Sequence, residues 1–287
     1  MRLPIRSPLR YRGGMRTALA LALVALSSPI LAAETPWQNV SPGVRLRLIA
    51  DNVRAPDGTT LIGLEVDMPA DHKTYWRVPG ETGIPTELDL AGSSGIGAHQ
   101  MIWPFPTRDE TGGYTDFVYY GPTVLPVRVS LSGDAADLKA AVVMGVCSDI
   151  CLPVQATFEL PLDFVRPSRG QGVRLAQAVA LAPLAWDKST PPVADVSFDP
   201  AARALNVQLT DPSIDPASLI AVGQGGAALF GAPQKSPDTN LVLLPLLGGD
   251  AGNSLVGMPV DFTFMTDRGA FTVTHQIAAA GSTPAPQ

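Results

Sequence analysis

Cysteine and histidine are the residues that this sequence has least of. It contains two cysteines, Cys147 and Cys151, and three histidines, His72, His99 and His275. A structural zinc site needs four closely arranged ligands, and the histidines are widely separated, so zinc is disfavoured. The sequence also lacks a Gly-x-Ser-x-Gly nucleophile elbow and a Gly-x₄-Gly-Lys-Ser/Thr phosphate loop, which argues against serine-hydrolase and P-loop chemistry.

Long hydrophobic runs are scarce as well. After residue 33 no stretch reaches the ~18 consecutive apolar residues of a membrane-spanning helix. The first 33 residues have the parts of a secretory signal peptide: a basic start with five arginines, a short apolar run over 17–26, and small residues ending at Ala32-Ala33. We therefore expect cleavage after Ala33 and a location outside the cytoplasm.

Positive charge is limited in what remains. The five arginines are the only charged residues of the signal, so its removal takes the net charge from −6 to −11. Such an acidic surface disfavours nucleic acid and anionic membranes as partners.

Proline and glycine are abundant, with 28 and 27 residues, which suits many short strands joined by turns. Apolar and polar residues alternate in short runs, which predicts strands with one face in a core and the other in water. The alternating runs cover 44–48, 64–68, 86–90, 127–131 and 156–160, and strand-like runs resume over 194–198, 205–209, 241–246, 260–265 and 270–277. The predicted fold is all-β: an antiparallel β-sandwich followed by a second, smaller β domain.

The alternation breaks around residues 170–184, where Val173, Ala176 and Val179 recur at helical spacing before Pro183. This short helix is expected to link the two β domains. The predicted organisation is a signal peptide over 1–33, a β-sandwich over 34–166, a helical linker over 167–192, a second β domain over 193–280 and a disordered tail over 281–287.

The two cysteines are the strongest indication of function. Export places them where disulfides persist. Only three residues separate them, so a bridge would remove little entropy from the unfolded chain and would stabilise the fold weakly. Pro153 must lie at an edge, bend or strand start, which predicts a pair at a turn between strands. The spacing leaves three interpretations open: a structural disulfide, reversible thiol–disulfide exchange, or metal binding.

For metal binding, the available donors are soft. Cys147, Cys151, Met144, His99 and Met101 offer sulfur and imidazole ligands, which would suit Cu(I).

A group of aromatic residues, Tyr114, Phe117, Tyr119 and Tyr120, is the second notable feature. Phe117 and Tyr119 would share one face of a strand. The group is expected either to pack in the core or to form a loop that shields a reactive site from solvent oxidants.

Four segments, taken in order, resemble the N-terminal periplasmic domain of DsbD-type thiol:disulfide interchange proteins, most closely the ScsB-like branch. They lie within about residues 40–165 and are 73–85 (KTYWRVPGETGIP), 103–106 (WPFP), 119–127 (YYG-x₃-LPV) and 146–153 (VC-x₃-CLP). The resemblance implies an immunoglobulin-like β-sandwich in the periplasm that relays reducing equivalents. The family is linked to cytochrome c biogenesis and, in the ScsB-like branch, to copper tolerance.

The resemblance also implies roles for individual residues. Cys151, followed by Leu152-Pro153, matches the cysteine that forms mixed disulfides, and Cys147 matches its partner in the redox pair. Both cysteines are therefore the predicted catalytic residues, and no cofactor is implied.

A cap loop that covers the redox pair until a partner docks is the second site that the resemblance implies. Tyr119-Tyr120-Gly121 resembles the Phe-Tyr-Gly of that loop, and Asp116 falls near its acidic position. The predicted cap residues are Asp116, Phe117, Tyr119 and Tyr120. The sequence departs from the family by having Tyr119 in place of the phenylalanine.

The implied partners are proteins of the same electron relay. Oxidised periplasmic thioredoxin-like or disulfide isomerase proteins would accept electrons. Segments resembling the family's membrane and thioredoxin-like domains are not found, so the expected donor is a separate membrane protein of DsbD/CcdA type. The predicted function is periplasmic thiol:disulfide exchange, the activity of a thiol:disulfide oxidoreductase. The alternative is a copper-handling or assembly module, or an inert structural disulfide.

Overall fold

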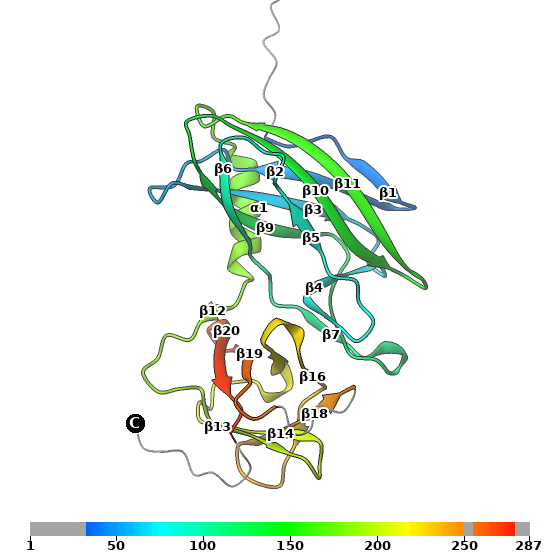
Figure 1. Ribbon diagram of the computed structural model, residues 1–287, viewed down its shortest axis with the longest axis vertical. Coiled ribbons are helices and arrows are strands. Elements are labelled where there is room, and N and C mark those ends of the chain that lie inside the picture. The colour runs from blue at the N-terminus through cyan, green and yellow to red at the C-terminus, as the bar shows by residue number, and fades with distance from the viewer. Residues whose placement is uncertain (1–32, 249–254, 279–287) are drawn as a thin grey trace, which may run out of the picture. The chain divides into compact units, whose positions relative to one another are not determined.

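Two antiparallel sheets form the first part of the chain in the computed structural model, which describes residues 33–248 and 255–278 (Figure 1). The strands are β1 Gln38–Ser41, β2 Val44–Ala50, β3 Thr59–Asp67, β4 Lys73–Gly80, β5 Glu87–Asp89, β6 Ile96–Met101, β7 Thr107–Asp109, β8 Asp116–Tyr120, β9 Thr123–Leu131, β10 Ala136–Cys147 and β11 Cys151–Leu162, with a 3-10 turn η1 at Thr111–Gly113. One sheet has the order β1-β2-β3-β9-β6, and the other has the order β11-β10-β4-β8-β7, with β5 paired to β10.

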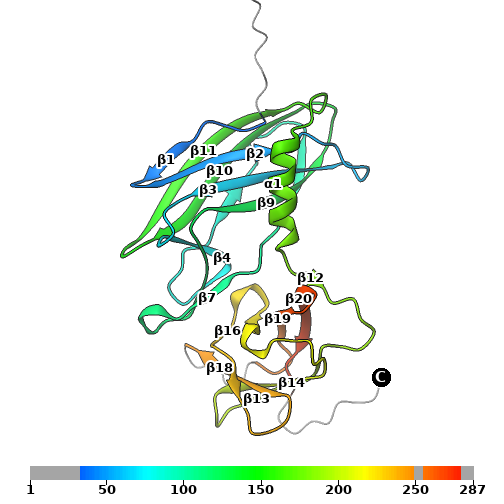
Figure 2. The same cartoon turned by 180° about the vertical axis from the view of Figure 1, so that it is seen from behind.

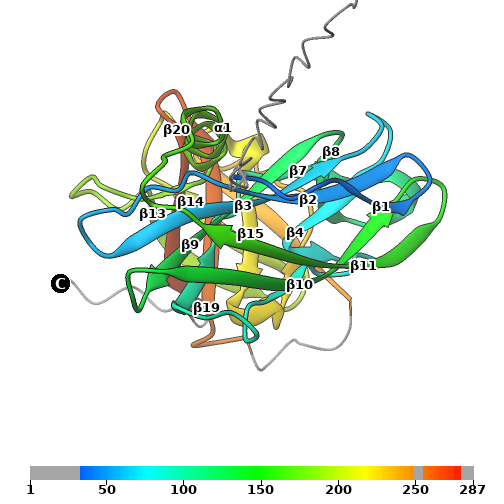
Figure 3. The ribbon, with the colours of Figure 1, turned by 90° about the horizontal axis from the view of Figure 1, so that it is seen from above.

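Period-two alternation explains why these two sheets pack face to face. In β11 the even-numbered residues from Val154 to Leu162 are buried and the odd-numbered ones are exposed, so one face enters the core. The β10–β11 hairpin keeps this register from Ala136↔Leu162 to Cys147↔Cys151 (Figure 3). Inward-facing side chains of both sheets form one hydrophobic cluster. The predicted antiparallel sandwich is confirmed.

Helix α1, Arg169–Ala180, covers the outer face of the first sheet, against β2, β3 and β9 (Figure 2). Leu175 is fully buried under it. A Cβ on Gly63 of β3 would lie 2.6 Å from Leu175 Cδ2, so the missing side chain makes room for the helix. Beside this contact, buried Glu65 pairs with Arg174 of the helix and, at 2.5 Å, with Arg47 of β2.

A second β region follows the helix, and it has its own hydrophobic core, with Phe230, Phe262 and Phe264 among its fully buried side chains. Its strands are β12 Leu184–Ala185, β13 Val193–Asp199, β14 Ala204–Leu209, β15 Ile220–Gly223, β16 Leu229–Phe230, β17 Gln234–Lys235, β18 Leu241–Leu247, β19 Pro259–Thr266 and β20 Gly269–Gln276, with 3-10 turns η2 Pro216–Ser218 and η3 Gln224–Gly226. Their order is β12-β20-β19-β15-β16-β18-β14-β13, with β17 paired to β18. The predicted all-β class, with a linking helix, is confirmed.

The described residues belong to one compact unit. Ile220 and Val222 of β15 join the hydrophobic cluster of the first sandwich, so the two β regions share part of a core.

No helix within 33–248 or 255–278 is long and apolar enough to cross a membrane. Residues 1–32 of the predicted signal peptide and the predicted tail lie outside the described residues, and the exact domain boundaries stay predictions.

The packing of α1 yields a prediction about stability. Leu175→Ala should lower the free energy of unfolding by about 2–5 kcal/mol, because it leaves a cavity between the helix and the first sheet. Val173→Ala on the same helix is the matched control, since Val173 is 58% exposed and should change stability little. Urea unfolding of the two variants measures the difference. Equal, small losses would contradict the docking of α1 through Leu175.

Candidate functional site

Cys147 and Cys151 form a disulfide at the tip of the β10–β11 hairpin. Cys147 ends β10, Cys151 begins β11, and the two are opposite each other in the register. The sulfurs are 2.09 Å apart and the Cα atoms 4.1 Å apart. The connecting residues 148–150 are exposed. The bond therefore lies at the end of a long hairpin, at the turn between strands that the sequence predicted.

The two cysteines differ in access to solvent. Cys147 is fully buried in a small cluster with Tyr75 and Val118, whereas Cys151 is exposed. Leu152, the next residue along β11, is 47% exposed. Cys151 is therefore the accessible residue of the pair, and Cys147 is covered.

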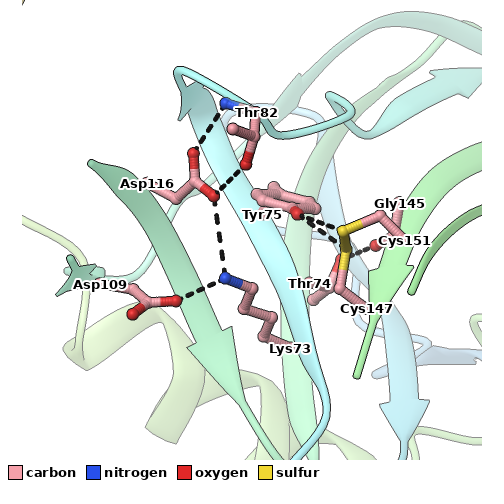
Figure 4. The surroundings of a disulfide bond; sticks show 9 residues. All are labelled: Lys73, Thr74, Tyr75, Thr82, Asp109, Asp116, Gly145, Cys147 and Cys151. Atoms are coloured by element: carbon pink, nitrogen blue, oxygen red, sulfur yellow. Dashed lines mark hydrogen bonds and ion pairs between the residues drawn. A yellow bond between two sulfur atoms is a disulfide. The ribbon is translucent and has the colours of Figure 1, made fainter. Parts of the chain in front are cut away.

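Tyr75 of β4 lies against both sulfurs (Figure 4). Its hydroxyl is 2.7 Å from Cys147 Sγ and 3.3 Å from Cys151 Sγ. Its ring fits where two glycines leave space: a Cβ on Gly145 would lie 2.9 Å from the ring, and one on Gly83 would lie 2.4 Å from it. Larger residues at these positions would push the ring away from the disulfide.

The environment of Tyr75 keeps its hydroxyl protonated. Burial, followed by the negative charges of Asp116 and Asp109, raises the pKa of Tyr75 to about 12. The sulfurs of a disulfide can only accept, so the phenol donates to them. After reduction the same O–H can donate to a thiolate, which favours the charged form and lowers the thiol pKa.

A lysine and two acidic residues form a buried network beside the tyrosine (Figure 4). Lys73 Nζ lies 2.5 Å from Asp109 Oδ2 and 3.7 Å from Asp116 Oδ2. Asp116 also accepts hydrogen bonds from the backbone N–H of Thr82 at 2.9 Å and its hydroxyl at 2.6 Å. Lys73 is the β4 residue opposite Cys147 in the sheet, so this network adjoins the disulfide.

Asp109 is ionised within this network. Burial opposes its ionisation, but hydrogen bonds from Lys73, Thr111 and Tyr120 outweigh burial and hold the pKa of Asp109 well below its usual range. Burial and the bond to Asp109 in turn raise the pKa of Tyr120 to about 12. The network beside the disulfide therefore holds two carboxylates and an ammonium group that partly neutralises them.

The predicted cap residues do not form a loop in the structure; they form strand β8, Asp116–Tyr120. Phe117 and Tyr119 point into the sandwich core. The Phe117 ring packs edge-on against Trp76 at a centroid distance of 5.8 Å, and the Tyr119 hydroxyl donates to the carbonyl of Pro104 at 2.8 Å. These two residues therefore pack in the core, and their shared strand face is the one that the sequence predicted.

The alternate residues of β8 face the disulfide side. Asp116 belongs to the Lys73 network, and Tyr120, which is 43% exposed, is opposite Lys73 in the register. The covering role that the resemblance implied for Asp116, Phe117, Tyr119 and Tyr120 stays a prediction.

The other predicted Cu(I) donors are not gathered at the cysteines. Met144 and Met101 pack in the cluster of the sandwich core, to which Cys147 does not belong. His99 lies exposed on β6 of the other sheet, with Nε2 3.2 Å from the Leu88 carbonyl oxygen. Among the residues that the structure describes, no group of three or more His, Cys, Asp or Glu side chains is placed to hold a metal.

Sequence reasoning did not single out Lys73, Tyr75, Asp109 or Thr82 as site residues. Period-two alternation would have placed Lys73 and Tyr75 on one face of a strand. Nothing in the sequence reveals that β4 lies between β10 and β8, and this placement brings Tyr75 against the sulfurs and Lys73 opposite Cys147.

Comparison with known proteins agrees with the geometry. Residues 47–163 match the family model described as thiol:disulfide interchange protein DsbD, N-terminal. Among solved structures, the N-terminal periplasmic domain of ScsB from Proteus mirabilis aligns with a TM-score of 0.68 at 24% identity, covering 86% of this chain and 99% of that one. The immunoglobulin-like sandwich is thereby confirmed.

A second solved structure, the adhesin domain of Epf from Streptococcus pyogenes, has a TM-score of 0.24 at 8% identity, covering 89% of this chain and 83% of that one. A likeness this low carries no argument. No curated protein matches the chain.

The tyrosine contact yields a prediction about thiol acidity. Tyr75→Phe should raise the pKa of the reduced cysteine pair by about one to two units, because a hydrogen bond to a charged group contributes about 1.5–3 kcal/mol and one pKa unit corresponds to about 1.4 kcal/mol. The pH dependence of thiol alkylation in the reduced protein measures it. Tyr119→Phe is the control, since its hydroxyl binds the Pro104 carbonyl. Equal shifts in both variants would refute a direct role for Tyr75.

Proposed function

This chain carries a DsbD-type N-terminal domain, ScsB-like, and from that premise we propose that it relays reducing equivalents to oxidised periplasmic thiol proteins through Cys147 and Cys151. The observation that carries the proposal is the unequal exposure of the pair. Cys151 is exposed, while Cys147 is buried against the hydroxyl of Tyr75. One sulfur is open to a partner and the other is positioned to complete the exchange.

The proposed reaction starts from the reduced pair. The Cys151 thiolate attacks one sulfur of a partner disulfide; a mixed disulfide forms, and the partner's second sulfur leaves as a thiolate that takes up a proton. Cys147, deprotonated in turn, then attacks Cys151 Sγ. The Cys147–Cys151 disulfide forms and the partner's first sulfur leaves as a thiolate. The partner gains two electrons and two protons, and the pair loses them.

Reloading the pair runs through the same sulfurs in reverse. A donor thiolate attacks the exposed Cys151 Sγ, and Cys147 leaves as a thiolate. The donor's second thiolate then attacks the donor sulfur of this mixed disulfide, Cys151 leaves as a thiolate, and the donor is left with a disulfide. Tyr75 is closest to the first leaving sulfur, that of Cys147, at 2.7 Å. A hydrogen bond that lowers the pKa of a leaving thiol speeds its departure, so Tyr75 favours the first step. The proposed donor is a separate membrane protein of DsbD/CcdA type, and the proposed acceptors are thioredoxin-like or disulfide isomerase proteins.

The location follows from the same premise. The solved structure that aligns with this chain is named as a periplasmic domain, and the reaction needs a compartment in which partner disulfides form. We place the protein in the periplasm, where such disulfides persist.

Substitution of each cysteine tests the assigned roles. Cys147→Ser should accumulate a mixed disulfide between Cys151 and the partner, because no second thiol releases it. Cys151→Ser should form no adduct, because the remaining thiol is buried. Non-reducing gels and mass spectrometry after mixing each reduced variant with an oxidised periplasmic disulfide isomerase measure the outcome. Trapping by Cys151→Ser instead would reverse the assignment, and trapping by neither would refute exchange with this partner class.

The reduction potential separates exchange from a structural role. We expect a value between about −180 and −270 mV, the range of exchange proteins. Equilibration in glutathione and dithiothreitol buffers, followed by thiol trapping, measures it. A value well below about −300 mV, with no transfer to a partner, would identify an inert structural disulfide.

A further inference from the structure

Arg108 of β7 joins the first sandwich to the second β region. Its Nη1 donates to the carbonyl oxygen of Ala217 at 3.0 Å, and its Nη2 donates to that of Leu219. Burial lowers the pKa of Arg108. Removing a guanidinium from water costs free energy unless its N–H groups are hydrogen-bonded. Arg108 therefore has to stay at these two carbonyls, and this holds β7 in place.

The next residue, Asp109, belongs to the disulfide site. Successive side chains of a strand point to opposite faces, so Arg108 reaches the second β region while Asp109 reaches Lys73 Nζ at 2.5 Å. Lys73 is opposite Cys147 in the sheet. Two adjacent residues thus connect the second β region to the surroundings of the sulfurs.

Strand β7 needs such an anchor. It is three residues long and forms the edge of its sheet, paired only with β8. Strand β4, which β8 separates from β7 in the sheet, makes a second contact with the second β region, where Arg77 Nη2 lies 3.2 Å from Asp261 Oδ2. Two of the three strands that carry the network, β4 and β7, therefore contact the second β region. In β7 the residue next to the contact, Asp109, is the one that binds Lys73.

We propose that Arg108 is a positioning residue for the redox pair. By binding the carbonyls of Ala217 and Leu219 it holds Asp109 on Lys73, and through this ion pair the second β region sets the acidity of the cysteine thiols and their reduction potential. The inference rests on the proposed exchange function and assigns the second β region a part in it.

The sign of the effect follows from the charges around the sulfurs. The titratable and charged groups of the network and the hairpin loop are Lys73 and Tyr75 of β4, Asp109 of β7, Asp116 and Tyr120 of β8, and Asp149 of the loop. Arg77 of β4 and Arg108 of β7 are instead bound to the second β region. Moving the Asp109 carboxylate away leaves a more positive surrounding. A thiolate is then favoured, so the thiol pKa falls, and the stabilised reduced form gives a higher reduction potential.

The experiment measures thiol pKa in the full chain after chemical reduction, by the pH dependence of alkylation. Asp109→Asn should lower the pKa, and Arg108→Gln should lower it by about half a unit or more in the same direction. In the Asp109→Asn background the Arg108→Gln change should have almost no further effect, because the carboxylate that it displaces is gone. The matched control is Asp261→Asn, which breaks the Arg77 contact and should leave the pKa at the wild-type value.

Several results would overturn the proposal: an unshifted pKa in folded Arg108→Gln, an undiminished effect in the double variant, or an equal shift in Asp261→Asn. Circular dichroism establishes that each variant is folded. If Arg108→Gln does not fold, Arg108→Lys takes its place. A lysine ammonium cannot bind both carbonyl oxygens as the forked guanidinium does, so Arg108→Lys should lower the thiol pKa by a smaller amount. The pKa measurement needs no partner protein, so it is independent of the exchange assay. A shifted thiol pKa in a protein that does not exchange with partners would overturn only the proposed function. Exchange with partners, together with an unshifted thiol pKa in Arg108→Gln, would overturn only this inference.

Discussion

The position of β4 between β10 and β8 is the constraint on which the site depends. On one side Lys73 is opposite Cys147, and on the other it is opposite Tyr120. Alternation along β4 then sends Lys73 and Tyr75 toward the sulfurs and the intervening residues toward the core, where Thr74 Oγ1 donates to the carbonyl of Gly145 at 2.8 Å. Packing of the core-facing side chains of β4 therefore fixes the position of the Tyr75 hydroxyl, which lies against the disulfide. A one-residue slip would exchange the two faces.

The electrostatics of the site combine two opposing effects of the same carboxylates. Asp109 and Asp116 disfavour a thiolate nearby. They also raise the pKa of Tyr75, which burial has already raised, to about 12, so the phenol remains a donor throughout the pH range in which thiols titrate. Lys73 lies between the two acids and partly neutralises them. The balance between this cation and the acids, with one fixed O–H, decides how much thiolate the reduced pair holds.

The sequence predicted what depends on neighbouring residues. Alternating runs identified strands in the first β region and strand-like runs identified those in the second. Helical spacing identified α1, and Pro153 placed the cysteines at a turn. The network could not be predicted, because Lys73 and Asp109 are 36 residues apart and meet only through the order of strands in the sheet. The aromatic segment shows the same limit. Phe117 and Tyr119 share a face as alternation requires, but β8 is buried on both sides except at Tyr120, so its pattern does not reveal which face meets the disulfide.

The β10–β11 hairpin depends little on the disulfide at its tip. The register of β10 with β11 runs unbroken over the length of both strands. The disulfide closes only the last turn, so it removes little entropy from the unfolded chain and adds little to the stability of the fold. Cys147 is held in its own buried cluster with Tyr75 and Val118, on the strand that also carries the core residue Met144. Backbone pairing of β10 with β11 therefore places the two cysteines opposite each other, one buried and one exposed.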